Sequence, residues 1–349
     1  MKFILAKPAE APFIREDEKI LKALGDLTIV PLHQNQGVVR YFIRILRLTV
    51  RIITCSKGTK VLIWFSDYHA AVAVFACRLR ALESYIFVGG YDTICYPELR
   101  MGVFCQPFRA ACAKYAFKHT SHIIANHDSL IRSSNTYYLP GGHPDGIKHF
   151  LPALRTPCSV VYNATSFTGI PNLDRQRKQQ VLCVGVTPRP EDFLNKGYDL
   201  LLQVCRAMPQ TRFIFVGIKN RWRDGLELSH PMKDLPNLEV IEWLPQPSLH
   251  ILMEESAVYV QASISEGMPN ALMEAMYYGC YPIGSNVAGI PTVIAGFGTI
   301  LLHRSETELK AAVEEALRKN PDRRAISESI GLRFSPQRRA QQITQILKD

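Results

Sequence analysis

Short apolar runs alternate with helix-length stretches along the whole chain. The runs are rich in β-branched and aromatic residues, which favour strands. Six of them lie in the first half of the chain and six in the second: 3–6, 27–31, 61–65, 85–88, 122–125, 159–162, 181–185, 212–217, 238–242, 258–261, 281–284 and 299–302. This regular alternation of strand and helix predicts an α/β fold, with parallel sheets covered by helices on both faces.

A polar stretch near the middle of the chain separates the two sets of strands. Residues 169–180 are rich in Arg, Lys, Gln and Asn, and a new strand follows them. A chain of 349 residues also exceeds the size at which single cores usually stop growing. We therefore predict two Rossmann-like domains, over residues 1–168 and 180–333, with their parallel sheets facing across a cleft. Ligands bind at the carboxyl ends of strands in such sheets, so we expect them in this cleft.

The positive charge of the chain is concentrated in its first half. The formal net charge is +10, and residues 1–168 contribute +9 of it, with 20 Lys and Arg against 11 Asp and Glu. A basic half of this kind indicates an acidic partner, and both nucleic acid and an anionic membrane surface fit it. We expect no nucleic acid, because aromatic and basic residues do not interleave as they do in a platform that stacks bases.

The apolar segments are too short for a membrane span or a leader. No apolar run reaches the roughly 18 residues that a spanning helix needs. The stretch at residues 3–6 is also shorter than the apolar part of a signal peptide, and it is interpreted as the first strand. The nine cysteines include no CxxC pair and lie mostly in apolar stretches, as free thiols of a reducing compartment do. These observations predict a cytoplasmic protein.

Four arginines recur at helical spacing in the first half of the chain: Arg40, Arg44, Arg47 and Arg51, with apolar residues between them. The pattern fits a helix that packs on the sheet and exposes its arginines to solvent. It also fits a helix that lies in a membrane interface, and both can hold together. An acidic membrane surface is therefore a candidate partner of the N-terminal half.

The segment 263–276, SISEGMPNALMEAM, carries the most chemical information and directly follows a predicted strand. Pro269 suits the first turn of a helix, and the residues after it are good helix formers. Free backbone N–H groups at such a helix start, together with the helix dipole, make a site for a diphosphate. Glu266 precedes the helix, and Glu274 lies about five residues into it, roughly 7–8 Å along the axis. A ligand with its diphosphate at the helix start could present one sugar to each glutamate, as a nucleotide sugar would.

This segment resembles the E-x7-E signature of the family 4 (group 1) retaining glycosyltransferases, which have the GT-B fold. The other segments that resemble the family are, in chain order, residues 13–21 and 89–92 in the acceptor domain, 161–167 at its end, 184–201 at the opening of the donor domain, and 279–291 after the signature. The resemblance thus covers nearly the whole chain. It implies that the last helix, residues 336–349, crosses back to the first domain.

The resemblance also implies a reaction. A sugar would pass from a nucleoside diphosphate sugar, UDP- or GDP-linked, to a hydroxyl of a glycan or lipid-linked acceptor, with retention of the anomeric configuration. The context would be the assembly of cell-surface polysaccharide or glycolipid at the inner face of the cytoplasmic membrane, with the enzyme bound peripherally. The family needs no metal, and the resemblance implies no other cofactor.

The roles of individual residues follow from the same resemblance. Glu266 would bind hydroxyls of the transferred sugar, Lys196 would neutralise the diphosphate leaving group, and Glu274 would hold the ribose hydroxyls. The remaining donor contacts would come from the helix start and from the loop that meets the base: Gly267, Met268, Pro269, Asn270, Ala271 and Leu244.

Two of the chain's departures from the family pattern bear on individual site residues. Val186 occupies the position where the family usually has an arginine as a second diphosphate cation, and Arg189 is the nearest residue that could replace it. Many members carry a histidine that faces the sugar from the first domain, whereas this chain has Gly-Gly-Tyr-Asp at residues 89–92. Asp92 is therefore the candidate for the acceptor contact, although it also fits a turn or a cap.

Two alternatives to a transferase remain at this point. A nucleotide-sugar epimerase on the same fold would convert the donor without an acceptor. A non-catalytic subunit that binds a sugar nucleotide or polysaccharide would bind nucleotide without turnover, and Val186 and the missing histidine motivate that interpretation.

Overall fold

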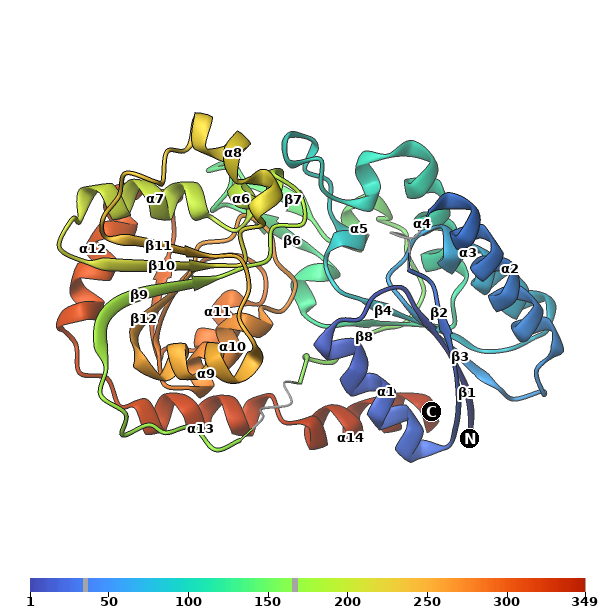
Figure 1. The fold of residues 1–349 in the computed structure, drawn as a ribbon. Coiled ribbons are helices and arrows are strands. Elements are labelled where there is room, and N and C mark those ends of the chain that lie inside the picture. Colours follow the sequence, from blue (N-terminus) through green and yellow to red (C-terminus); the bar gives the residue numbers. More distant parts are fainter. Residues whose placement is uncertain (34–36, 165–168, 349) are drawn as a thin grey trace. The chain divides into compact units, whose positions relative to one another are not determined.

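The computed structural model describes residues 1–33, 37–164 and 169–348, and it contains two compact units (Figure 1). Unit 1 comprises Met1–Ser133, Pro144–Ser166 and Phe334–Asp349. Unit 2 comprises Ser134–His143 and Phe167–Arg333. The predicted boundary at residue 168 and part of the 161–167 motif lie outside the described residues, as does Asp349 at the end of the predicted last helix.

Unit 1 is built on a six-stranded sheet in which every strand pairs in parallel with its neighbours, in the order β2-β1-β3-β4-β5-β8. The strands are β1 (Lys2–Lys7), β2 (Asp26–Pro31), β3 (Lys60–Trp64), β4 (Ser84–Val88), β5 (His122–Ala125) and β8 (Cys158–Val160). Most of their inner positions are β-branched, aromatic or leucine residues with almost no exposed surface. Strands buried on both faces explain why these apolar runs are continuous and do not alternate with polar residues.

Helices cover both faces of this sheet and enclose two separate apolar cores. One core lies under α2 (Val38–Thr54), α3 (Tyr68–Leu79) and α4 (Pro107–His119). The other lies under α1 (Pro12–Leu24) and the last helix, α14 (Pro336–Lys348), which are neighbours in Figure 1. The short elements of the unit are η2 (Tyr91–Thr93), η3 (Pro97–Leu99), η4 (Val103–Cys105), η5 (Asp128–Leu130) and α5 (Ile147–Phe150).

Unit 2 repeats the plan with a second parallel sheet of six strands, in the order β11-β10-β9-β12-β13-β14. The strands are β9 (Lys178–Val184), β10 (Arg212–Val216), β11 (Leu238–Ile241), β12 (Ser256–Gln261), β13 (Tyr281–Ser285) and β14 (Thr299–Leu301). The helices are α6 (Glu191–Asn195), α7 (Tyr198–Ala207), α8 (Asn220–Ser229), α9 (Gln246–Glu255), α10 (Asn270–Tyr277), α11 (Ile290–Ile294), α12 (Glu306–Arg318) and α13 (Arg323–Arg333). None of the helices in the described part of the chain is long and apolar enough to cross a membrane.

The α/β fold class is confirmed, and every one of the predicted strands is present, six in each sheet. Two short strands were not predicted: β6 (Ser133–Asn135) and β7 (His143–Asp145), which pair with each other where the chain leaves unit 1 and returns to it. The polar stretch 169–180 is not all linker, because β9 already begins at Lys178 and Gln180 is buried. Polar residues at the start of a strand do not belong to its apolar run, so the hydrophobic pattern places the start of the strand too late.

A buried ion pair fixes α14 to the rest of unit 1. Arg339, only 2% exposed, binds Asp17 of α1 through Nε to Oδ1 (2.6 Å) and Nη2 to Oδ2 (2.9 Å). Its Nη1 donates to the carbonyl oxygens of Val161 and Tyr162, both at 2.8 Å. Trp64 donates its indole N–H to the same carboxylate at 3.1 Å. The guanidinium therefore holds the last helix by hydrogen bonds that satisfy both buried charges.

We expect the change Arg339→Met to destabilise unit 1 by about 3–5 kcal/mol, because it leaves the buried carboxylate of Asp17 without its cation. Urea or thermal denaturation of the full chain measures the loss. Arg338→Met is the matched control, since Arg338 is exposed on the same helix and its change should alter stability by less than about 0.5 kcal/mol. Equal stability of the two variants would contradict this account of α14.

Candidate functional site

A carboxylate and a lysine meet at the carboxyl end of β12. Lys196 Nζ lies 2.5 Å from Glu266 Oε1, and the two side chains are 23% and 13% exposed. The same Oε1 accepts hydrogen bonds from Gln261 Nε2 (3.1 Å) and Ser263 Oγ (3.0 Å). Glu266 Oε2 has no hydrogen-bond partner among the described residues. Burial by itself would lower the pKa of Lys196, but the charge and hydrogen bond of Glu266 outweigh it and raise that pKa.

Gly197 allows this lysine to approach the strand. Its φ is +74°, in the left-handed region that favours glycine, and a Cβ there would lie 2.3 Å from the carbonyl oxygen of Ala262. The residue before the lysine, Asn195, is bonded to the loop after β12 twice: its carbonyl accepts from Ile264 N (2.8 Å) and its side chain accepts from Ser265 N (3.1 Å). The Lys196 stem also packs over Gly185, where a Cβ would lie 3.0 Å from its Cγ. These contacts set the ion pair in a fixed place.

The helix α10 begins one residue later than the sequence predicts. Pro269 is the N-cap and not a residue of the first turn, and the helix runs from Asn270. The loop before it is fixed by a hydrogen bond from Gly289 N to the carbonyl oxygen of Gly267 (3.0 Å). A Cβ at Gly289 would come within 2.7 Å of that oxygen, so the glycine permits the close approach. The first-turn N–H groups of such a helix have no partner within the helix and favour an anion.

Glu274 lies on α10, half-buried, and it has no hydrogen-bond or ion-pair partner among the described residues. Burial raises its pKa from 4.5 to about 7. Burying an acidic group without a hydrogen-bond or ion-pair partner lowers the stability of the folded protein. This carboxylate is therefore a candidate to accept hydrogen bonds from a ligand.

The other residues considered for the donor site lie outside the Lys196–Glu266 pair. Arg189 is engaged by its neighbour Asp192, with Nη2 at 2.6 Å from Oδ1 and Nε at 3.3 Å from Oδ2. Val186 is 58% exposed in the loop after β9. Leu244 is half-buried in the loop between β11 and α9. Met268 is 5% exposed and so supports the loop before α10 from inside.

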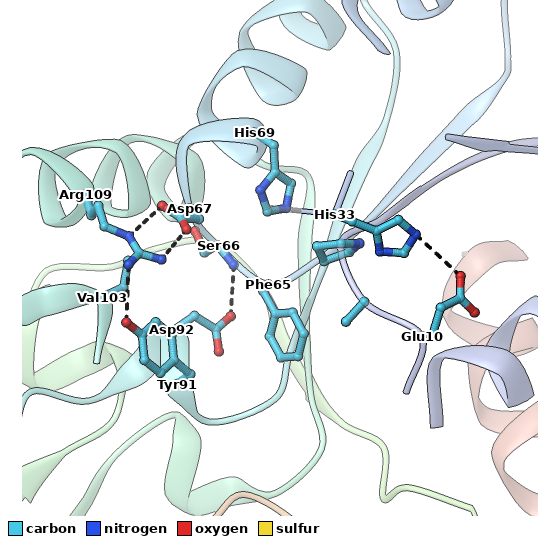
Figure 2. A pocket seen from close by; sticks show the side chains of 12 residues that line it. Glu10, His33, Phe65, Ser66, Asp67, His69, Tyr91, Asp92, Val103 and Arg109 are labelled. Carbon is cyan, nitrogen blue, oxygen red and sulfur yellow. Dashed lines mark hydrogen bonds and ion pairs between the residues drawn. The ribbon is translucent and has the colours of Figure 1, made fainter. Parts of the chain in front are cut away.

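Unit 1 contains a cavity of about 540 Å³ at the carboxyl ends of β3 and β4, and Asp92 lines it (Figure 2). The Asp92 carboxylate accepts backbone N–H groups from Ser66 (3.0 Å), Gly89 and Gly90 (both 3.2 Å). Burial raises the pKa of Asp92 to about 6, against the opposing effect of these hydrogen bonds. The carboxylate thus organises the turn and faces the cavity at the same time. A group that titrates near neutral pH can accept a proton there.

The cation of this cavity, Arg109, was not predicted from the sequence. Arg109 of α4 binds Asp67 through Nε to Oδ1 (3.0 Å) and through a second, shorter contact between Nη2 and Oδ2. Its Nη1 donates to the hydroxyl of Tyr91 at 3.2 Å (Figure 2). Asp67 closely follows the predicted strand 61–65, and ligands bind at the carboxyl ends of such strands, so the sequence could have indicated this residue. No comparable signal marks Arg109, which reaches the cavity from the start of a helix.

The two groups of side chains offer complementary chemistry. Unit 2 has a lysine, a helix start and a partnerless carboxylate, which suit an anion with hydroxyls attached to it. Unit 1 has a buried carboxylate beside an arginine in a cavity, which suits a polar group that loses a proton. No group of three or more His, Cys, Asp or Glu side chains within the described ranges is placed to hold a metal ion.

We expect the change Glu274→Gln to stabilise the ligand-free protein in a pH-dependent way. The folded protein binds the Glu274 proton up to about pH 7 and the unfolded chain only up to about 4.5, so this carboxyl makes stability fall as the pH rises between these values. Glutamine is neutral throughout. The melting temperature of the variant should therefore exceed that of the wild type clearly at about pH 8 and much less at about pH 5.

Glu314→Gln is the control, because Glu314 is an exposed helical glutamate of the same unit. It should show no pH-dependent gain. If Glu274→Gln lowered the melting temperature at the higher pH, Glu274 would have a stabilising partner and the interpretation would be wrong.

Comparison with known proteins gives matches to part of the chain in sequence and to the whole chain in fold. The family model "Glycosyl transferases group 1" matches residues 176–331. Two curated relatives are subunits of phosphatidylinositol N-acetylglucosaminyltransferase. The one from Arabidopsis thaliana is 24% identical over 128 residues, and the gpi3 subunit from Schizosaccharomyces pombe is 25% identical over 121 residues. The matches cover 35% and 34% of this chain and 28% and 26% of the relatives. The chain thus matches about a quarter of the length of these relatives.

Solved structures match over the whole chain. Sucrose-phosphate synthase of Thermosynechococcus elongatus has a TM-score of 0.72 at 12% identity, covering 100% of this chain and 98% of that one. HepE of Anabaena, solved in complex with UDP, has a TM-score of 0.66 at 15% identity and covers 100% of both chains. At these identities the match speaks for the fold. Residues 176–331 thus match the model of the group 1 glycosyltransferases, and the two parallel α/β units of the chain have the GT-B fold.

Proposed function

We propose that this protein is a retaining glycosyltransferase that moves a sugar from a nucleoside diphosphate sugar to a hydroxyl of a glycan or lipid-linked acceptor. The observation that carries the proposal is the Lys196–Glu266 pair beside the start of α10, with the partnerless Glu274 on the same helix. The match of this region to the group 1 family supports it. The neighbour solved with UDP supports a nucleotide as the ligand.

The donor would bind along α10. Its diphosphate lies at the backbone of residues 267–271 with Lys196 beside it, since a helix start and an ammonium group both stabilise phosphate charge. Glu274 accepts hydrogen bonds from the two ribose hydroxyls. These charge-assisted hydrogen bonds offset the cost of burying its carboxylate. Glu266 is held by Lys196 through one oxygen and offers Oε2 to the sugar hydroxyls.

The chemical step needs stabilisation of the leaving diphosphate. Lys196 and the helix start supply positive potential there, and this fixed electrostatic stabilisation takes the place of a metal in the proposal. A second cation is less available, because Val186 is apolar and Arg189 is paired with Asp192. Retention follows from front-face transfer, in which the departing phosphate oxygen helps to deprotonate the acceptor. A product with inverted anomeric configuration, seen by proton NMR, would contradict this part.

The acceptor would be bound by unit 1. Asp92 and the Arg109–Asp67 pair line a cavity large enough for a sugar or a head group. The net charge of the N-terminal half, +9 over residues 1–168, fits an acceptor at an acidic membrane surface. The curated relatives are named for transfer to phosphatidylinositol, a lipid. The reaction we propose therefore belongs to cell-surface polysaccharide or glycolipid assembly, with the enzyme peripheral on the cytoplasmic side of the membrane.

Calorimetric titration of UDP, GDP and ADP in the presence of EDTA tests the donor site. One nucleotide should bind wild-type protein selectively, and the dissociation constant should not change when EDTA is omitted. Ribose hydroxyls on a carboxylate are worth about 1.5–3 kcal/mol. Glu274→Ala should therefore weaken binding roughly ten- to a hundredfold.

Glu314→Ala, at an exposed glutamate of α12, should bind the nucleotide as the wild type does. Failure of folded wild-type protein to bind any of the three nucleotides would exclude the donor-site assignment. Binding that required a divalent cation would contradict the metal-independent mechanism and leave the site in place.

A further inference from the structure

The helix α2 has three distinct faces, and only one of them meets the core. Tyr41, Ile45, Leu48 and Ile52 are buried against the sheet. At about 100° per residue, the arginines form a second sector. A third, roughly 140° wide, contains only exposed apolar side chains apart from Thr49: Val38 (70%), Val39 (72%), Phe42 (62%), Ile43 (45%), Leu46 (63%), Val50 (51%) and Ile53 (45%). The sequence pattern did not separate the buried apolar side chains from the exposed ones.

The exposed apolar surface continues onto the next two helices. Val72, Phe75 and Leu79 of α3 and Phe108 of α4 are also exposed. Together α2, α3 and α4 contain 11 of the 21 exposed large hydrophobic residues in the described chain. They pack side by side over the same core, and they are neighbours in Figure 1. An exposed patch of this extent is typical of a surface that binds something.

The charge on this surface is of one sign. The sequences of α2, α3 and α4 contain no Asp or Glu. Their basic residues are Arg40, Arg44, Arg47, Arg51, Arg78, Arg109, Lys114 and Lys118. Arg40, Arg47 and Arg51 are exposed, and none of the three has a carboxylate within ion-pair distance in the described part of the chain.

This combination points to one kind of partner. A second copy of the same face would set arginine against arginine, which is unfavourable. Nucleic acid would use the arginines but would leave the aliphatic side chains of α2 in water. An anionic bilayer uses both, because apolar side chains enter the acyl boundary while arginines lie at lipid phosphates.

The surface also adjoins the cavity of Asp92. An apolar cavity of about 610 Å³, with no charged residue in its lining, lies between α2, α3 and α4. Tyr41 lines it and hydrogen-bonds His69 of the Asp92 cavity (3.2 Å). Tyr68 also lines it, and the guanidinium of Arg109 lies 5.7 Å from the Tyr68 ring centroid. These two tyrosines therefore connect the apolar cavity to side chains that line the polar one.

We propose that the face formed by α2, α3 and α4, the docking face, binds an anionic lipid bilayer, and that its apolar cavity takes a hydrocarbon chain from that bilayer. The bilayer contact does not depend on sugar transfer. The cavity assignment extends the proposed function, because a chain held there would place the attached head group next to Asp92. The acceptor is then a lipid whose hydroxyl-bearing head group enters the Asp92 cavity from the membrane.

Vesicle flotation of the full chain tests the docking face. Wild-type protein should float with phosphatidylcholine vesicles that contain roughly 30% phosphatidylglycerol and should bind pure phosphatidylcholine much more weakly, since each basic residue near the surface contributes about a fivefold gain. The double variant Phe42→Ser/Leu46→Ser should bind the anionic vesicles at least about tenfold more weakly. Leu228→Ser/Leu332→Ser is the control, because these exposed leucines lie in unit 2, and it should bind as wild type does.

Two outcomes would overturn the docking face. One is a folded wild-type protein that ignores anionic vesicles, and the other is a double variant that binds them like the wild type. A dimer in sedimentation analysis that dissociates in the double variant would identify a second copy as the occupant instead. Nucleotide titration of the same preparations keeps the questions apart, since a failed donor site leaves vesicle binding unchanged.

A phosphatidylcholine with a photoreactive group on its acyl chain, incorporated in the same vesicles, tests the cavity. Mass spectrometry should find adducts on residues of the apolar cavity, above all on Val72, Phe108 and Cys112. Adducts confined to those exposed apolar residues of α2 that do not line the cavity would leave the docking face in place and would exclude the cavity as a site for a hydrocarbon chain.

Discussion

The ion pair between Lys196 and Glu266 is the interaction on which the candidate site of unit 2 depends. Lys196 directly follows α6, and Glu266 lies in the loop after β12. Three features join these two segments: the positive φ of Gly197 against Ala262, the two hydrogen bonds of Asn195, and the packing of the Lys196 stem over Gly185. A half-buried pair of this kind gives little net stability, because desolvation offsets the attraction. Its arrangement is explained better by what it offers a ligand, namely a fixed positive charge and one carboxylate oxygen.

The carboxylates that suit a ligand are those to which the described chain gives no cation. Glu274 is withdrawn from water without a partner in the described chain, and Asp92 accepts only backbone N–H groups and is buried with a raised pKa. Both positions cost stability in the ligand-free protein. Asp17 is the opposite case. It is buried, but both of its carboxylate oxygens accept hydrogen bonds from Arg339, and one also accepts from Trp64. The carboxylate that has a cation thus joins two helices, and the two that have none are the candidates for contact with a ligand.

The fold was predictable because the strands of both sheets are largely buried, so each strand reads as a short apolar run. The start of α10, with Glu266 before it and Glu274 within it, was predictable because a loop and a helix start are local features of the sequence. Arg109 was not, since its place beside Asp67 and Tyr91 depends on how α4 packs. The exposed apolar face of α2 was left open between a packed helix and a membrane-interface helix, because an apolar position in a helix does not reveal whether the sheet or solvent faces it. The strands β6 and β7 are too short to form a pattern.

A crystal structure with the nucleotide that calorimetry selects tests the central claim most directly, because it shows which groups touch the diphosphate and the ribose. The account predicts the diphosphate within hydrogen-bond distance of Lys196 Nζ and of the backbone N–H groups at the start of α10, with both ribose hydroxyls on the Glu274 carboxylate. A nucleotide bound elsewhere in unit 2, or one at α10 whose ribose does not touch Glu274, would contradict it.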